Sequence, residues 1–294
     1  MAMNLRDMLA PPWMAARRLG QVLGGTREPA GTFRILMFHA IPRECTGDFA
    51  RLLDRIASGP GFIDPEEATR RIDGKGLAGD ASARPPVLIS FDDGFASNGH
   101  VAREIMAPRG IRAVFFVCPA LIDLTGDAQE EAVLRQVFRG HRPVRAIEPM
   151  LSWNAIRGLA TDGHVIGAHG MNHIRLAGLD TVVLEEEVAG AHRALKDRLG
   201  RAPDWFAYPF GDVDAIDAAA LATIGKHFRY CRSGVRGANV PGSNPLALRA
   251  DNIDLDASPA WQHLAADGAL DFRYQAPRAR LDSRAHAITS GEAV

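Results

Sequence analysis

Short apolar runs alternate with helix-like stretches along most of this chain, and that alternation limits the possible folds. The strand-like runs occupy residues 34–41, 87–91, 111–117, 165–168, 205–208, 230–232 and 246–253. The main helix-like stretches between them occupy residues 49–56, 98–106, 153–160, 181–199 and 214–224. This order is typical of parallel strands that are connected through helices. We therefore predict an α/β fold with a parallel sheet closed, or nearly closed, into a barrel; an open doubly wound sheet is the alternative.

Charge and glycine patterns exclude two classes of partner. The 34 basic and 35 acidic residues give a net charge of −1, which is unlike the basic surface of a nucleic-acid-binding protein. None of the early strands runs directly into a Gly-x-Gly-x-x-Gly or Gly-x4-Gly-Lys-Ser/Thr turn, so a nucleotide site is not indicated. We expect no nucleic-acid partner.

Cysteines and apolar runs bear on the compartment. Three widely spaced cysteines indicate neither a disulfide framework nor a cysteine zinc site, and fit a reducing compartment. No uncharged apolar run approaches the 18 residues of a membrane-spanning helix. In residues 1–25 the arginines follow the apolar residues, unlike in a signal peptide, so we expect a cytoplasmic protein. A leader helix packed on the domain is one interpretation of this segment, and peripheral membrane contact is the other.

Composition divides the chain into three parts. We predict a leader over residues 1–30, a barrel domain over 31–275 and, because apolar residues become sparse, a disordered tail over 276–294. A polar, arginine-rich insertion is expected at 126–149. The acidic run 185–187 reads as the solvated first turn of a helix.

Two carboxylates stand where the second apolar run ends. Asp92 and Asp93 follow residues 87–91 and precede Gly94, which permits a turn with positive φ. In parallel α/β folds the carboxyl ends of the strands form the working face, so such residues are candidates for chemistry. A helix cap or simple turn is the alternative interpretation of an Asp-Asp-Gly sequence.

Two histidines stand where the fourth run ends. His169 and His173 are four residues apart, so on either a helix or a strand both imidazoles lie on the same side and can face one metal ion. Among ten histidines such spacing also arises by chance. Two histidines and one aspartate from a neighbouring strand end together make the three-ligand set of a catalytic zinc site, with an open position for water.

The fifth run leads into an aromatic turn that contains Tyr208, Phe210 and Gly211. A packed turn is one interpretation. The other is an apolar wall with exposed backbone N–H groups, suited to a sugar ring and to an oxyanion.

These motifs, in this order, resemble the polysaccharide deacetylases with a NodB-type domain, carbohydrate esterase family four. The similar segments are Ser90-Phe-Asp-Asp-Gly94, His169-Gly-Met-Asn-His173 and Phe206-Ala-Tyr-Pro-Phe-Gly211. One subgroup adds an early Leu-Met-Tyr-His motif, which Ile35-Leu-Met-Phe-His39 resembles, and a Leu-Ser-Trp sequence like that at Leu151. The resemblance extends over residues 34–254.

The resemblance implies a distorted (β/α)₇ barrel that removes N-acetyl groups from an amino sugar or glycan. It implies Asp93, His169 and His173 as ligands of Zn²⁺, or of another divalent metal such as Co²⁺, Ni²⁺ or Mn²⁺, and Asp92 as the general base. An acetamide is a poor electrophile, so activation by a metal and a base agrees with this chemistry.

The chain departs from the family pattern at three positions. The late Leu-x-His motif reads Leu246-Ala-Leu-Arg249, so we expect His39 to act as the general acid. Gly170 stands where the family usually has Ser or Thr, which removes a hydroxyl from the metal-binding loop. Ala207 stands where many members have an arginine that pairs with the base, and Arg249 is our candidate replacement. Tyr208, Phe210 and Arg249 are predicted to contact substrate.

Two alternative functions stay open at this point. One is a metal-dependent hydrolase of a cyclic amide or imide on the same scaffold. The other is an inactive barrel that only binds carbohydrate. Release of acetate distinguishes a deacetylase from both.

Overall fold

The computed structural model of the chain describes residue 12 and residues 28–75 and 84–289. The predicted leader, residues 1–30, lies outside these ranges apart from Pro12 and residues 28–30. The predicted membrane contact of residues 1–25 lies outside them apart from Pro12.

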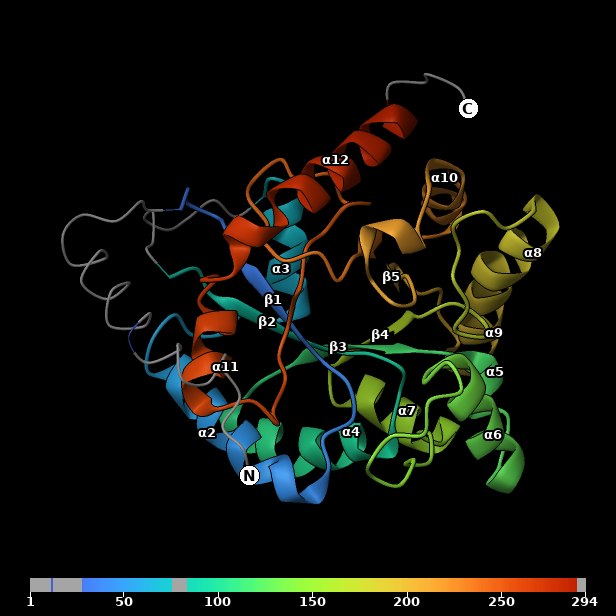
Figure 1. Cartoon of the computed structure of the whole chain (residues 1–294), viewed down its shortest axis with the longest axis horizontal. Coiled ribbons are helices and arrows are strands. Elements are labelled where there is room, and N and C mark those ends of the chain that lie inside the picture. The colour runs from blue at the N-terminus through green and yellow to red at the C-terminus, as the bar shows by residue number, and fades with distance from the viewer. Residues whose placement is uncertain (1–11, 13–27, 76–83, 290–294) are drawn as a thin grey trace.

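Seven parallel strands form one sheet in the order β6-β5-β4-β3-β2-β1-β7 (Figure 1). The strands are β1 (Arg34–Phe38), β2 (Val87–Phe91), β3 (Ala113–Val117), β4 (Val165–Ala168), β5 (Trp205–Ala207), β6 (Tyr230–Arg232) and β7 (Asp251–Asn252). Strands β1 to β6 follow one another in sequence order across the sheet, so the open doubly wound alternative is wrong.

The segment before β7 bends the sheet toward closure. The Leu248 N–H donates to the carbonyl of Cys231 on β6 at 3.0 Å, whereas Asp251 and Asn252 pair with β1 at the other edge. One segment therefore contacts both edge strands, as a barrel requires. The predicted last strand, 246–253, is divided between the two edges, and only its end forms regular pairing.

Helices surround the curled sheet (Figure 1). They are α2 (Thr46–Ala57), α3 (Pro65–Ile72), α4 (Ala96–Val101), α5 (Pro119–Ile122), α6 (Gly126–Gln136), α7 (Trp153–Thr161), α8 (Thr181–Glu185), α9 (Ala191–Leu199), α10 (Ala218–His227), α11 (Pro259–Ala266) and α12 (Gln275–Thr289). Short π-helical stretches η2 (Ala102–Met106) and η4 (Glu186–Gly190) follow α4 and α8. The 3₁₀ turns are η1 (Arg43–Cys45), η3 (Ala107–Arg109), η5 (Val213–Ala215) and η6 (Asp271–Tyr274).

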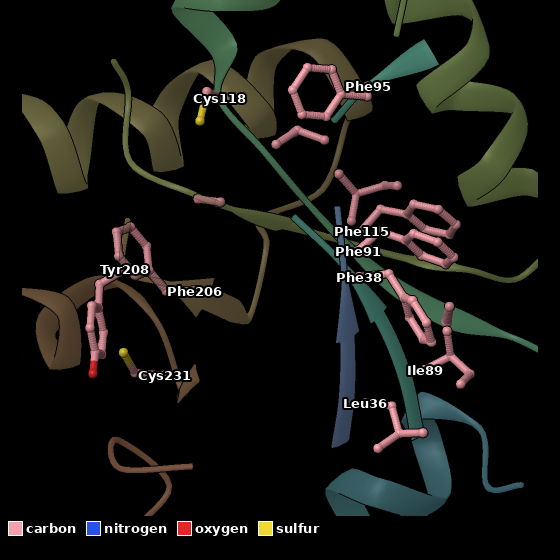
Figure 2. Packing of buried hydrophobic residues seen from close by; sticks show 14 of the residues in the cluster. Leu36, Phe38, Ile89, Phe91, Phe95, Phe115, Cys118, Phe206, Tyr208 and Cys231 are labelled. Atoms are coloured by element: carbon pink, nitrogen blue, oxygen red, sulfur yellow. The ribbon is translucent and has the colours of Figure 1, made fainter. Parts of the chain in front are cut away.

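An aromatic layer holds the first three strands together. The rings of Phe91 on β2 and Phe115 on β3 stack nearly parallel with centroids 4.8 Å apart, and Phe38 of β1 adjoins them (Figure 2). Phe49 of α2 meets Phe38 edge-on at 5.1 Å. Each fully buried phenylalanine contributes roughly 1.5–3 kcal/mol. This layer fixes the strand ends that carry the polar residues described below.

The predicted disordered tail is wrong for residues 276–289. These residues belong to α12, which buries Leu281 and Ala285 four residues apart on one face. Arg284 of the same helix donates to the Ile216 carbonyl at 2.8 Å. Two buried apolar residues are too few to change the composition of the segment, so composition does not reveal this helix. They nevertheless anchor it to the domain. None of the described helices is long and apolar enough to cross a membrane.

Candidate active site

The polar strand ends meet at one cleft of about 1020 Å³ at the carboxyl edge of the sheet. His39 follows β1, Asp92 and Asp93 follow β2, and His169 follows β4. Because the strands are parallel, their carboxyl ends share an edge, which brings residues far apart in sequence together.

Asp93, His169 and His173 form a buried cluster in this cleft. Asp93 Oδ1 lies 3.2 Å from His173 Nε2 and 3.5 Å from His169 Nε2. The three candidate ligand atoms all lie within 4.8 Å of one another. Each of the three residues is at most 4% exposed. The structure thus brings together the three residues predicted as metal ligands.

Backbone carbonyls orient both imidazoles. His169 Nδ1 donates to the Ala207 carbonyl at 2.7 Å, and His173 Nδ1 donates to the Gln136 carbonyl at 3.2 Å. A carbonyl only accepts, so each neutral ring carries its hydrogen on Nδ1 and turns the lone pair of Nε2 toward Asp93. Asp93 Oδ1 is consequently buried with no hydrogen-bond donor among the described residues. One carboxylate oxygen and two imidazole nitrogens without hydrogens are donors that suit a divalent metal such as Zn²⁺.

The electrostatics favour the ligand states of two of the three residues, an ionised Asp93 and a neutral His169, while His173 is shifted toward its protonated form by Asp93. Burial lowers the pKa of His169 to about 4, so this ring is neutral at pH 7. Burial alone would raise the pKa of Asp93, but His173 and the other nearby histidines outweigh it and hold that pKa well below its usual range. Burial opposes protonation of His173, and Asp93 nevertheless raises the pKa of His173.

Unusual backbone angles gather around the cleft. Asp93, His173, Phe210 and Arg139 all have positive φ, at 70°, 59°, 67° and 53°, and all line the cleft. Such angles are uncommon outside glycine and cluster at functional sites, where the surrounding structure enforces them. Gly94 has φ +88°, as the Asp-Asp-Gly turn predicts, and a Cβ there would lie 3.0 Å from Val117 Cγ1.

Arg232 at the end of β6 is the ion-pair partner of Asp92. Its Nη2 contacts Asp92 Oδ1 in a fully buried pair, whereas Asp92 Oδ2 lies 3.9 Å from His169 Nε2. The prediction that Arg249 takes this position is wrong, because Arg249 pairs with Asp282 at 2.7 Å and does not line the cleft. The strand-like run 230–232 ends in Arg232 and follows the run at 205–208. The place of Arg232 at the carboxyl end of a strand was therefore a signal that the sequence contained.

The two aromatic side chains of the turn lie in different places, one in the core and one in the cleft. Tyr208 is fully buried and its hydroxyl donates to the Gly211 carbonyl at 3.0 Å, so the prediction that it contacts substrate is wrong. Phe210 lines the cleft, with its ring centroid 4.8 Å from that of His173. The Arg139 guanidinium lies 3.9 Å from the centre of the Phe210 ring.

Glu187 supports the loop that carries the two histidines. It lies in η4 and is only 2% exposed, so the predicted solvated position is wrong. Its Oε2 accepts from the backbone N–H groups of Met171 and Asn172, each at 3.1 Å, and its Oε1 accepts from Asn172 Nδ2 at 2.6 Å. The sequence contained no signal for this residue, because no residue pattern reveals the π-helical turn in which Glu187 lies.

The predicted insertion forms one wall of the cleft. After α6 the chain runs through residues 137–149, most of which line the cleft. Arg145 binds Glu44 at 2.8 Å and Asp256 at 2.7 Å, and so joins this wall to η1 and to the segment after β7.

Comparison with known proteins agrees with this architecture. A family model described as polysaccharide deacetylase matches residues 79–228, just over half of the chain. The solved structure of IcaB from Ammonifex degensii is 21% identical, with a TM-score of 0.63, covering 83% of this chain and 99% of that one. The deacetylase PplD from Streptococcus pyogenes is 19% identical, with a TM-score of 0.63 and coverages of 80% and 97%.

The BpsB deacetylase domain from Bordetella bronchiseptica is 14% identical, with a TM-score of 0.58 and coverages of 78% and 98%. A search of curated proteins finds no match. The structural likeness confirms the predicted NodB-type barrel. The chain belongs to the polysaccharide deacetylase family, whose members are hydrolases of N-acetyl amide bonds.

Proposed function

We propose that this chain removes N-acetyl groups from an amino sugar of a glycan, with a divalent metal held by Asp93, His169 and His173. The observation that carries the proposal is the convergence of three buried ligand atoms beside Asp92, which Arg232 holds in place. The related PplD was solved with acetate, the acid that this hydrolysis releases.

Asp92 is the general base in this proposal. A metal in the site would polarise the acetyl carbonyl and lower the pKa of a bound water toward about 7. Arg232 occupies Asp92 Oδ1, so Oδ2, which faces His169, is the oxygen that accepts the proton of the attacking water. A salt bridge to a buried arginine keeps the carboxylate in one orientation for this transfer.

The Phe210 backbone N–H is our candidate donor to the developing oxyanion. No described residue accepts a hydrogen bond from it. The Tyr208 hydroxyl holds the turn through the Gly211 carbonyl, and a preorganised donor is what such stabilisation requires.

His39 is the general acid. Its side chain is exposed and lines the cleft, and its own carbonyl accepts from Asn98 Nδ2 at 2.8 Å, which fixes the backbone at the end of β1. When the C–N bond breaks, His39 supplies the proton that the departing sugar amine needs. We assign the catalytic domain to residues 31–275, with α12 packed against it.

The decisive test is acetate release from N-acetylglucosamine oligomers by the metal-loaded protein, with Asp92→Asn beside the wild type. We expect Asp92→Asn to bind metal normally and to lose about 10²- to 10⁴-fold in turnover, the usual contribution of a general base. Asp123→Asn, at an exposed position outside the cleft, is the matched control and should behave as wild type. Bound metal without acetate from any glycan would contradict the proposal and favour hydrolysis of a cyclic amide.

A further inference from the structure

A second cavity of about 440 Å³ adjoins the catalytic cleft. Asn252 and Asp254, at the end of β7 and just after it, line both cavities, so the two are neighbours across one short segment. The other residues that line it come from α11, from η6 and the residue just before it, and from the segment between β6 and β7. All of them follow residue 228, where the family match ends, so family membership by itself does not imply this cavity.

The lining combines aromatic surface with polar groups. Trp261 and Tyr274 are half-buried and present ring surface beside Leu270. Arg236 is only 8% exposed, and its Nη1 lies 3.6 Å from Asp251 Oδ1, so its guanidinium is held in place. Aromatic surface with a few fixed polar groups is the usual chemistry of a small-ligand site.

Several polar groups in this cavity have no partner among the residues that the structure describes. The Trp261 indole N–H, the Tyr274 hydroxyl and the Arg273 guanidinium make no hydrogen bond or ion pair with another described residue. Aromatic rings with such polar ends bind ligands that have both an apolar face and hydroxyl groups. A pyranose ring has both, since its C–H face can pack on an indole while its hydroxyls bond to arginine and asparagine.

We propose that this second cavity binds a sugar residue of the substrate other than the one that is deacetylated, with Trp261 as its stacking platform. The inference rests on the proposed function and deepens it. The substrate is then an oligomer or polymer long enough to reach from the cluster of Asp93, His169 and His173 past Asn252 and Asp254. The volume of the second cavity lies within the range of about 300–1,000 Å³ that is typical of small-ligand sites.

The test compares N-acetylglucosamine with its linear tetramer. For the wild type we expect kcat/KM to be higher for the tetramer than for the monomer. Trp261→Ala should reduce this tetramer-to-monomer ratio roughly 3- to 10-fold, the effect of losing one aromatic contact. Trp261 also packs against the core, so Arg273→Ala is the second variant. The exposed Arg273 side chain has no partner among the described residues, and its loss should reduce the ratio too.

Trp153→Ala is the matched control, because this tryptophan lies outside both cavities. Its ratio should equal that of the wild type. An unchanged ratio in both folded cavity variants would overturn the inference while leaving the deacetylase assignment intact.

A calorimetric titration of the tetramer into Asp92→Asn, with and without Trp261→Ala, tests the cavity without turnover. Weaker binding in the double variant supports the inference even if no glycan releases acetate, which would be the failure of the proposed function. Equal binding by the two proteins contradicts it.

Discussion

The carboxylate of Glu187 occupies the space beside Gly170. A Cβ at Gly170 would lie 3.1 Å from Glu187 Oε2, and Gly170 itself has φ +73°. The family usually has a hydroxyl residue at this position. In this chain the backbone N–H groups of the loop between His169 and His173 donate instead to a side chain 17 positions beyond Gly170, in η4.

Replacing Glu187 should therefore weaken metal binding more than it weakens folding. We expect Glu187→Ala to lose about 10- to 100-fold in metal affinity, the usual effect of removing a group that orients metal ligands. Glu187→Gln keeps one oxygen acceptor and should restore most of the affinity. Titration with Zn²⁺ against a competing chelator measures both. Equal affinity in Glu187→Ala and the wild type would show that the loop needs no such support.

Introducing the serine that the family usually has at position 170 should destabilise the folded protein. Gly170→Ser places a side chain at positive φ and against Glu187, so we expect a loss of about 1–3 kcal/mol in the free energy of unfolding. In Glu187→Ala the space is vacant and the serine hydroxyl can replace the lost acceptor. Chemical denaturation of the two single variants and the double variant measures this. The free energy of unfolding of the double variant should be higher than the sum of the two single losses predicts.

Loss of Arg232 should leave Asp92 buried without its partner. We expect Arg232→Met to lower the free energy of unfolding by about 3–5 kcal/mol, because a lone buried charge is costly. Turnover should fall while metal content stays at the wild-type level, because Arg232 does not contact Asp93. Arg249→Met, at the position that the sequence suggested, should retain turnover. Elemental analysis and acetate release measure these outcomes, and loss of activity in Arg249→Met alone would reverse the assignment.

Metal should stabilise the protein through the three proposed ligands. With Zn²⁺ at about 100 times its dissociation constant, the expected gain is about 2.7 kcal/mol, which appears as a higher midpoint of thermal unfolding. His173→Ala and Asp93→Asn should lose this gain. Asp212→Asn removes a carboxylate from the same cleft outside the triad and should keep it. The same rise in all four proteins would point to binding elsewhere.

His164 should make the stability of the protein fall in mild acid. Burial lowers the pKa of His164, and its Nδ1 accepts the Ala113 N–H at 3.1 Å, so protonation is unfavourable in the folded state. The unfolded chain binds this proton from about pH 6.5, so the free energy of unfolding decreases as pH falls below that value. His169, whose pKa is lowered to about 4, acts in the same direction.

We therefore expect His164→Gln to reduce the slope of the free energy of unfolding against pH by up to about 1.4 kcal/mol per pH unit. The exposed His100, changed to Gln, is the control and should leave the slope unchanged. Urea denaturation between pH 7.5 and 5 measures the slope. A slope in His164→Gln equal to that of the wild type would contradict this account.

The sequence by itself determined the alternation of parallel strands with helices and the polar residues that follow the strand ends. Apolar runs of a few residues that stop just before Asp92, His169 and Pro209 are local signals, since each depends on a strand and the turn directly after it. Parallel connection then requires those ends to meet at one edge, so a site made of two histidines and an aspartate could be predicted there. The choice of Asp93 rather than Asp92 as the ligand came from the resemblance to the deacetylase family.

Only the tertiary structure decided which side chains support that site. Arg232 and Asp92 are 140 positions apart, and whether Arg232 or Arg249 reaches the base depends on how the sheet curls and on which segment passes between its edges. The burial of Tyr208 and the inward turn of Glu187 likewise depend on packing against segments distant in sequence. Such contacts follow from side-chain direction and close packing in three dimensions, which no local pattern of residues contains.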